Sequence, residues 1–184
     1  MNKPKSTKAR LLSAACAVFA EKGFRDATVA EICEAADANI AAVNYHFGDK
    51  ESLYDAVWHD AFERTNDAHP IDGSLPEHPE LHDFLYSYAY AILHRIFSEG
   101  EPGLFAKLLY REMASPTLAL DRIAREVLQP QSEFLAKALR TAFESVMDEN
   151  ELRLCLHSII WICEFYNFSR PLLERVLGQR TLSE

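Results

Sequence analysis

The sequence predicts an all-α protein, and three observations support this class. Apolar residues recur every three or four positions along most of the chain, as on one face of an amphipathic helix. No segment shows the sustained alternation of polar and apolar residues, bounded by turn residues, that is typical of strands. Residues that favour helix starts stand before several of the periodic segments. We therefore expect a small N-terminal helical domain followed by a larger helical domain.

The first helix is expected at residues 6–22. Its apolar stripe consists of Leu11, Leu12, Ala15, Val18 and Phe19. Gly23 stands where a left-handed residue would end the helix, because glycine adopts a positive φ without a steric penalty. Phe24 follows as the hydrophobic residue that folds back on the last turn.

Two short helices joined by a tight turn are expected next. Thr28 and Glu31 form a capping box, in which each side chain accepts a hydrogen bond from the other residue's backbone N–H. Asn39 is a favourable N-cap for a third helix at residues 40–47. The turn at residues 37–38 connects the two helices. Held by the preceding long helix, this pattern predicts a helix-turn-helix motif.

A fourth helix and a linker complete the N-terminal domain. Asp49 is expected to cap a helix at residues 50–65. Residues 66–80 carry three prolines, a glycine, two histidines and four acidic residues, a composition that is typical of a linker. We therefore expect two domains, at residues 1–65 and 66–184.

The second domain is predicted to be helical throughout. Helices are expected at residues 81–98, 102–114, 117–147 with an interruption at Pro130, 149–168 and 171–177. Pro116 and Pro171 fit the first turns of helices, where a missing N–H costs little.

Charge and composition limit the function. The 184-residue chain has a formal net charge of −9, but residues 1–50 hold seven basic and six acidic residues, so the remainder is at −10. A nucleic-acid-binding surface must lie at the N-terminal end, because an acidic surface repels phosphates. No 18-residue apolar span and no signal-like segment is present, so we expect a cytoplasmic protein without membrane contact.

Catalytic and metal-binding motifs are absent from the sequence. There is no phosphate-binding loop, dinucleotide fingerprint, nucleophile elbow or zinc-protease motif. His78 and His82 could share a metal, but no third ligand is in view. The four cysteines form no C-x-x-C pair and lie in apolar stretches, which favours structural thiols over a metal or redox role. We expect no enzyme activity, no cofactor and no metal site.

The third helix has the features of a DNA-reading helix. Val43 and Phe47 can anchor it in the core. The residues left facing outward are Ile40, Asn44 and Tyr45. An exposed isoleucine beside an amide is unusual on a solvated face. It suits the major groove, where an apolar group contacts a thymine methyl and an amide contacts a base edge.

Lys50 supports the same interpretation. It lies in the first turn of its helix, where the helix dipole disfavours a cation by about 0.3–1 kcal/mol. A DNA phosphate beside that helix N-terminus would reverse the sign of this effect. The alternative is a solvated lysine, with Asp49 and Glu51 offsetting the cost.

Residues 6–62 resemble, without a gap, the N-terminal domain of the tetracycline-repressor (TetR/AcrR) family. The segments that carry the resemblance are Thr28-Val29-Ala30-Glu31-Ile32, residues 39–47, and Asp49-Lys50-Glu51-Ser52-Leu53-Tyr54. The phosphate contacts that the resemblance implies come from Thr28, Tyr45, His46 and Lys50. The implied base or groove contacts come from Ile40, Ala41 and Asn44, and Asn39 completes the expected DNA-binding set. Asn44 stands where many members carry an aromatic residue, which favours a base contact there.

Shorter segments of the second domain resemble the CecR-type subgroup of this family. They are residues 111–116, 119–121 and 169–172. The bulky Trp161 and Ile162 replace smaller or polar residues expected in that subgroup.

Glu112 is the most informative residue of the second domain. It follows Phe105 by seven residues and Leu108 by four, on an apolar stripe where an acid needs a partner. That partner is either another side chain in a structural hydrogen bond, such as His94 or a tyrosine, or a ligand. The residues predicted to bind an effector are Tyr88, His94, Phe105, Leu108 and Glu112.

Residues 152–168 are apolar on nearly every side, which requires burial on every side. One side can face the protein's own core and the other a second subunit; the alternative is a central helix in a monomer. The predicted dimer interface consists of Ile159, Ile162, Phe165, Tyr166 and Leu172. A two-fold dimer would present two reading helices about 34–36 Å apart.

These features predict a ligand-responsive transcriptional regulator. We expect a homodimeric repressor that binds a palindromic double-stranded DNA operator and is released by a small-molecule effector. The alternative is a helical small-molecule-binding or scaffold protein whose helix-turn-helix no longer binds DNA. The small net charge of residues 1–50 keeps that alternative open.

Overall fold

The computed structural model describes residues 6–98, 100–101, 103–143 and 146–176. Within these ranges every regular element is a helix and no strand occurs, so the predicted all-α class is confirmed. Among the same residues, none of the helices combines the length and apolar character that a bilayer crossing needs.

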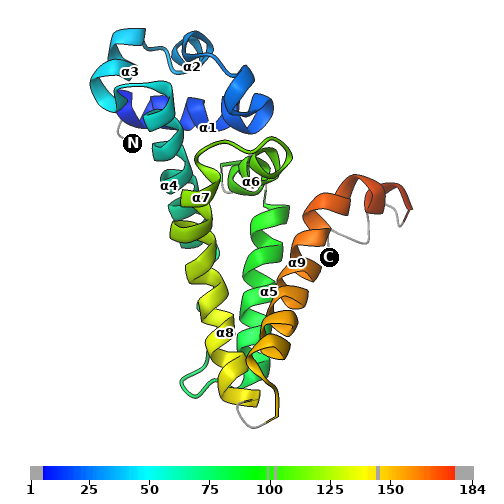
Figure 1. The fold of residues 1–184 in the computed structure, drawn as a ribbon. Coiled ribbons are helices and arrows are strands. Elements are labelled where there is room, and N and C mark those ends of the chain that lie inside the picture. The colour runs from blue at the N-terminus through cyan, green and yellow to red at the C-terminus, as the bar shows by residue number, and fades with distance from the viewer. Residues whose placement is uncertain (1–5, 99, 102, 144–145, 177–184) are drawn as a thin grey trace. The chain divides into compact units, whose positions relative to one another are not determined.

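The first of two compact units comprises Met1–Ala68 and Glu99–Val127. Its helices are α1 (Thr7–Asp26), α2 (Val29–Ala35), α3 (Ile40–Phe47), α4 (Lys50–Ala68), α6 (Leu104–Ala114) and α7 (Leu120–Ile123). Helix α1 packs against α4 and α6, and the short α2 and α3 pack against each other and against α1 (Figure 1). The long helix α1 is therefore the common support of the two short helices.

An aromatic cluster fills the core of this unit. The Tyr54 ring lies edge-on to Phe19 at 4.8 Å and to Trp58 at 6.1 Å, measured between ring centroids. Phe105 of α6 lies edge-on to Trp58 at 5.7 Å. Such pairs add about 0.5–1.5 kcal/mol each beyond the burial of their area, so they fix α1, α4 and α6 together.

The second compact unit comprises His69–Ser98 and Leu128–Glu184. Its helices are α5 (Leu81–Phe97), α8 (Gln129–Phe143) and α9 (Glu149–Val176), which run side by side (Figure 1). Arg95 is buried in this unit, and its guanidinium donates to the His69 carbonyl at 2.9 and 2.7 Å and to Gln131 Oε1 at 2.5 Å. Burial lowers the pKa of Arg95 to about 10. Because this value is still well above 7, the side chain remains charged at neutral pH. The functional boundary predicted at residue 65 stays a prediction.

Helix boundaries near glycine and proline differ from the predictions. Gly23 has the expected positive φ of 78°, but the chain resumes a helical turn after it, so α1 continues to Asp26 instead of ending near residue 22. Helix α7 begins at Leu120 rather than near residue 117, which places Pro116 in the preceding segment instead of a first helical turn. Helix α6 begins at Leu104 instead of residue 102, and α4 extends to Ala68.

Prolines in the second half of the chain interrupt the helices less than predicted. A π-helical turn, η1 (Ala124–Leu128), precedes Pro130, and its wider winding accommodates the ring that would clash with the carbonyl four residues earlier. Helix α9 runs without interruption from Glu149 to Val176, so the predicted division into helices at 149–168 and 171–177 is wrong. A proline removes one backbone hydrogen bond, and the remaining bonds of a 28-residue helix suffice to continue it.

Candidate nucleic-acid interface

The start of α2 is fixed by the capping box that the sequence predicts. Thr28 Oγ1 accepts from the Glu31 N–H at 3.2 Å, and the Glu31 carboxylate accepts from the Thr28 N–H at 3.0 Å. Lys22 of α1 adds a bond of 2.6 Å to the same carboxylate. The Lys22 ammonium and then the Thr28 donors lower the pKa of Glu31 to about 2. Thr28 itself stands at this helix start as its N-cap.

The turn between α2 and α3 has a residue in the left-handed region. Asp37 has a φ of 48°, which aspartate tolerates better than most residues because its short polar side chain bonds locally. Arg10 of α1 closes the turn from outside: Nε donates to the Ala36 carbonyl and Nη2 to the Asp37 carbonyl, both at 3.0 Å. Sequence reasoning missed this role of Arg10, since no local pattern connects residues that far apart.

Helix α3 presents the predicted outward face. Asn39 Oδ1 accepts from the Ala42 N–H at 2.9 Å, which caps the helix as expected. Val43 is buried, whereas Ile40 is 53% and Tyr45 is 83% exposed, and Asn44 is also exposed. An apolar, an amide and a phenolic side chain are therefore exposed to solvent on this eight-residue helix.

The other expected contact residues lie around this face. Ala41 is exposed, and His46 is half-buried with its ring edge-on to Tyr45 at 4.9 Å. Thr28 and Lys50 begin the helices on either side of α3, and α3 packs against both α2 and α4. The predicted set thus comes from three neighbouring helix segments of one compact unit (Figure 1). Its contact with DNA stays a prediction.

Lys50 is held in place rather than simply solvated. Its ammonium lies 4.6 Å from the centroid of the Phe24 ring, within the range of a cation–π interaction. The same group donates to the Arg25 carbonyl at a long 3.5 Å. Asp49 caps α4 by accepting from the Ser52 N–H at 2.7 Å, and this bond lowers the pKa of its carboxyl.

Glu112 of α6 finds its partners within the protein. It is 1% exposed, and its carboxylate accepts from the Tyr54 hydroxyl at 2.7 Å. The backbone N–H and the hydroxyl of Thr117 both donate to its other oxygen at 2.7 Å. The carboxylate therefore accepts two hydrogen bonds from Thr117, five residues further along the same chain, and one from Tyr54 of α4. These partners support a structural role for Glu112 over a role as ligand anchor.

The five predicted effector-binding residues lie in two different compact units. Phe105 and Leu108 are buried beside Glu112 in the first unit, where Phe105 contacts Trp58. Tyr88 and His94 belong to α5 of the second unit. Tyr88 is buried, and burial raises the pKa of its hydroxyl. Tyr88, Phe105 and Leu108 thus pack in the cores of their units, whereas His94 is exposed.

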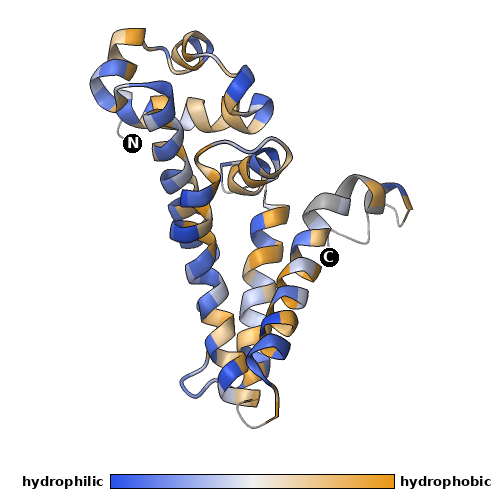
Figure 2. Cartoon of the chain, in the orientation of Figure 1, coloured by the Kyte–Doolittle hydropathy of each residue, from blue (hydrophilic) through white to orange (hydrophobic). Residues whose placement is uncertain are grey.

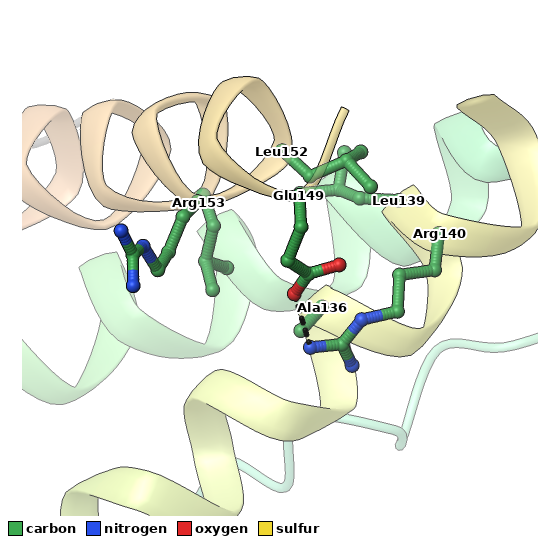
Figure 3. Close-up of a pocket in the computed structure, with 7 residues that line it drawn as sticks. Ala136, Leu139, Arg140, Glu149, Leu152 and Arg153 are labelled. Carbon is green, nitrogen blue, oxygen red and sulfur yellow. Dashed lines mark hydrogen bonds and ion pairs between the residues drawn. The ribbon is translucent and has the colours of Figure 1, made fainter. Parts of the chain in front are cut away.

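Two cavities lie elsewhere. The first, between α8 and α9, has an interior of about 20 Å³ and is lined in part by Leu139, Leu152 and the ion pair of Arg140 with Glu149 at 3.1 Å (Figure 3). The second lies in the first unit beside Trp58 and has about 10 Å³. Both have room for a water molecule at most, so neither holds an effector in this conformation.

Helix α9 has one covered and one open side. Leu152 and Cys163 are buried, and Ile159 is half-buried. Of the other predicted interface residues, Ile162, Phe165, Tyr166 and Leu172 are all exposed. Leu154, Trp161 and Val176 are exposed apolar residues of the same helix that the prediction did not include. Hydrophobic residues recur along the part of α9 that is coloured in Figure 2.

An exposed reading helix on a capped helix-turn-helix, joined to a second helical unit, defines a helix-turn-helix transcriptional regulator. Residues 11–57 match the family described as bacterial regulatory proteins, tetR family. Residues 81–184, more than half of the chain, match the family described as HTH-type transcriptional dual regulator CecR, C-terminal domain. The chain belongs to this CecR-type branch of the TetR-family regulators.

Individual relatives agree with this assignment. The HTH-type transcriptional dual regulator CecR of Shigella flexneri is 27% identical over 91% of this chain and 80% of its own. The HTH-type transcriptional repressor AcnR of Corynebacterium glutamicum is 27% identical over 80% of this chain and 81% of its own. The resemblance inferred from sequence motifs and the predicted transcriptional regulator are both confirmed.

Solved structures support the same fold. HlyIIR, described as a hemolysin II transcriptional regulator, superposes with a TM-score of 0.64 at 23% identity, over 96% of this chain and 95% of its own. The TetR family transcriptional regulator PfmR from Thermus thermophilus gives 0.68 at 22% identity, over 89% and 86% of the two chains. At such identities the likeness concerns the fold alone.

Proposed function

We propose that this regulator is a homodimeric repressor that binds a palindromic DNA operator and releases it when a small-molecule effector binds. The observation that carries the DNA-binding part is the exposed face of α3, with Val43 buried behind it. Ile40 can contact a thymine methyl group and Asn44 a base edge in the major groove. Lys50 and the N–H groups at the start of α4 supply a phosphate site.

The open side of α9 supports the homodimer. Seven large apolar residues are exposed among the described residues of this one helix, and a concentration of exposed apolar residues is typical of a protein–protein contact surface. A two-fold dimer built on this surface would match the symmetry of a palindromic operator.

Control by an effector depends on two conformations of the protein. A ligand can shift the balance between two conformations only by binding one of them better. The two cavities described above have room for water alone, so an effector that binds at either of them requires a rearrangement that opens space. The relative named a repressor supports repression, whereas the other is named a dual regulator. Membership of the family weighs against a scaffold protein that no longer binds DNA.

Selection of bound fragments from random duplex DNA tests the proposal. The expected result is an enriched palindrome whose half-sites lie about one helical turn apart. The logarithm of the affinity should fall linearly with the logarithm of salt concentration, because phosphate contacts release counterions. No enrichment, together with binding that is insensitive to salt, would contradict the proposed function.

A further inference from the structure

Two groups hold the Lys50 ammonium from different sides. One is the Phe24 ring, whose centroid lies 4.6 Å from Nζ. The other is the Arg25 carbonyl, which accepts from Nζ at 3.5 Å. Both groups belong to the last turn of α1, immediately after the positive-φ residue Gly23. The position of Lys50 therefore depends on what fixes this turn.

The first path from Phe24 leads to Glu112. The Phe24 ring packs against the Tyr54 ring, with 5.0 Å between their centroids. Tyr54 is buried, and its hydroxyl donates to Glu112 Oε2 at 2.7 Å. This charge-assisted bond fixes the rotation of the tyrosine side chain and thus the surface on which Phe24 rests.

The second path returns to the same carboxylate. The Arg25 guanidinium donates to the Pro116 carbonyl at 3.5 Å. The next residue, Thr117, gives both its backbone N–H and its hydroxyl to Glu112 Oε1 at 2.7 Å. All of these residues lie in one compact unit. The two paths therefore meet at the two oxygens of Glu112 on one side and at the Lys50 ammonium on the other. Together they form a closed ring of contacts.

We propose that Glu112 is a positioning residue for DNA binding, which sets the place of the Lys50 ammonium through Tyr54 and Phe24 and through Thr117, Pro116 and Arg25. A cation–π contact depends on where the ring face lies, so a ring that loses its support no longer directs the ammonium. Any displacement of the end of α6 then alters the phosphate contact without touching DNA. The inference rests on the proposed phosphate contact of Lys50.

A double-mutant cycle tests this coupling in the full-length protein. Tyr54→Phe keeps the aromatic ring and removes the hydroxyl that donates to Glu112. Lys50→Ala removes the ammonium group whose position the proposal explains. Affinity for the selected operator and for a scrambled duplex of equal length is measured over a series of salt concentrations. Tyr54→Phe should weaken the affinity for both duplexes by about threefold to tenfold when Lys50 is present. In the Lys50→Ala background it should weaken them by less than about twofold.

Val57→Ala is the matched control for stability. Val57 is fully buried on the same helix, and its truncation lowers the free energy of unfolding without touching the ring of contacts. It should leave the salt dependence unchanged, whereas Tyr54→Phe should shift it toward that of Lys50→Ala. Glu112→Gln, which keeps the shape and removes the charge, should act in the same direction and replaces Tyr54→Phe if that variant does not fold.

The outcomes separate two failures. If Lys50→Ala leaves affinity and salt dependence unchanged, the proposed phosphate contact is wrong and the inference falls with it. If Lys50→Ala weakens binding, but Tyr54→Phe weakens it equally in both backgrounds or no more than Val57→Ala does, Glu112 serves folding alone and the positioning role is overturned.

Discussion

Helices α3 and α9 both expose large apolar side chains, but they differ in length and in what accompanies those side chains. Helix α3 spans Ile40–Phe47, and its exposed Ile40 and Tyr45 stand beside the amide of Asn44. Helix α9 spans Glu149–Val176, about 42 Å of helix. Its exposed apolar residues are Leu154, Trp161, Ile162, Phe165, Tyr166, Leu172 and Val176.

The difference indicates that the two faces suit different partners. A short face that mixes apolar and hydrogen-bonding groups matches the edges of base pairs, which present methyl groups, donors and acceptors together. A long face of large apolar residues gains little from a polar partner and is stabilised by another apolar surface. The comparison therefore supports the proposal that α3 contacts DNA and α9 a second copy of the chain, and each part of the proposal can be tested separately.

The largest effect is expected from Ile162→Glu. Ile162 is 64% exposed in the single chain, so a glutamate is tolerated in the monomer but places a charge inside an α9–α9 interface. Light scattering should give 20.9 kDa for this variant and twice that mass for the parent protein. Operator affinity should fall by about 100-fold or more, because the two half-sites no longer bind together.

Leu118→Glu makes the same chemical change at a matched position. Leu118 is 98% exposed in the first compact unit, outside α9. This variant should remain a dimer with parental operator affinity. A dimeric Ile162→Glu protein, or a monomeric parent, would remove the assignment of a second copy to α9.

The sequence predicts the helix-turn-helix well because its signals are local. The capping residues of α2 and α3 act on N–H groups three residues away, so a short window of sequence contains both partners. The outward face of α3 follows from helical periodicity, since burying Val43 leaves Asn44 and Tyr45 on the other side. The exposure of Ile40, Asn44 and Tyr45 on α3 could therefore be predicted from the sequence.

The features that could not be predicted depend on contacts between residues that lie far apart in the sequence. Periodicity predicts that Glu112 is buried, but its partner Tyr54 is 58 residues away. The aromatic residues chosen as an effector site share the spacing of core residues, and Phe105 packs in the core. The continuity of α9 past Pro171 is equally hidden, because proline weakens a helix by an amount that packing of the whole helix can offset.

A smaller effect is expected from Asn44→Ala on the reading face. Loss of one amide contact should relax the preference at one base pair in each half-site, by about 1–3 kcal/mol. Competition titrations with operators changed at single positions measure this preference. Asn150→Ala, an exposed asparagine at the start of α9, is the matched control and should leave the preference unchanged. An Asn44→Ala protein with the parental preference at every position would show that α3 does not read bases through this residue.

The smallest effect concerns the capping box that orients α3 through α2, and it depends on pH. The pKa of Glu31 is lowered to about 2 by the Lys22 ammonium and the Thr28 donors, below the usual value of 4.5. A lowered pKa means that the ionised carboxylate contributes stability above about pH 4.5, and that this contribution disappears as the pH falls toward 2.

Glu31→Gln isolates this contribution, because the amide keeps the shape but cannot form the charged bond with Lys22. Urea unfolding of both proteins between pH 7 and pH 2 should show the parent more stable at pH 7, with the difference closing steadily below about pH 4.5. Glu34→Gln is the control, since Glu34 lies on α2 but takes no part in the capping box. A difference between Glu31→Gln and the parent that persists unchanged at pH 2 would show that the loss comes from altered packing. The ordered start of α2 would then owe nothing to the charge of Glu31 and would depend on the hydrogen bond that Thr28 Oγ1 accepts from the Glu31 N–H.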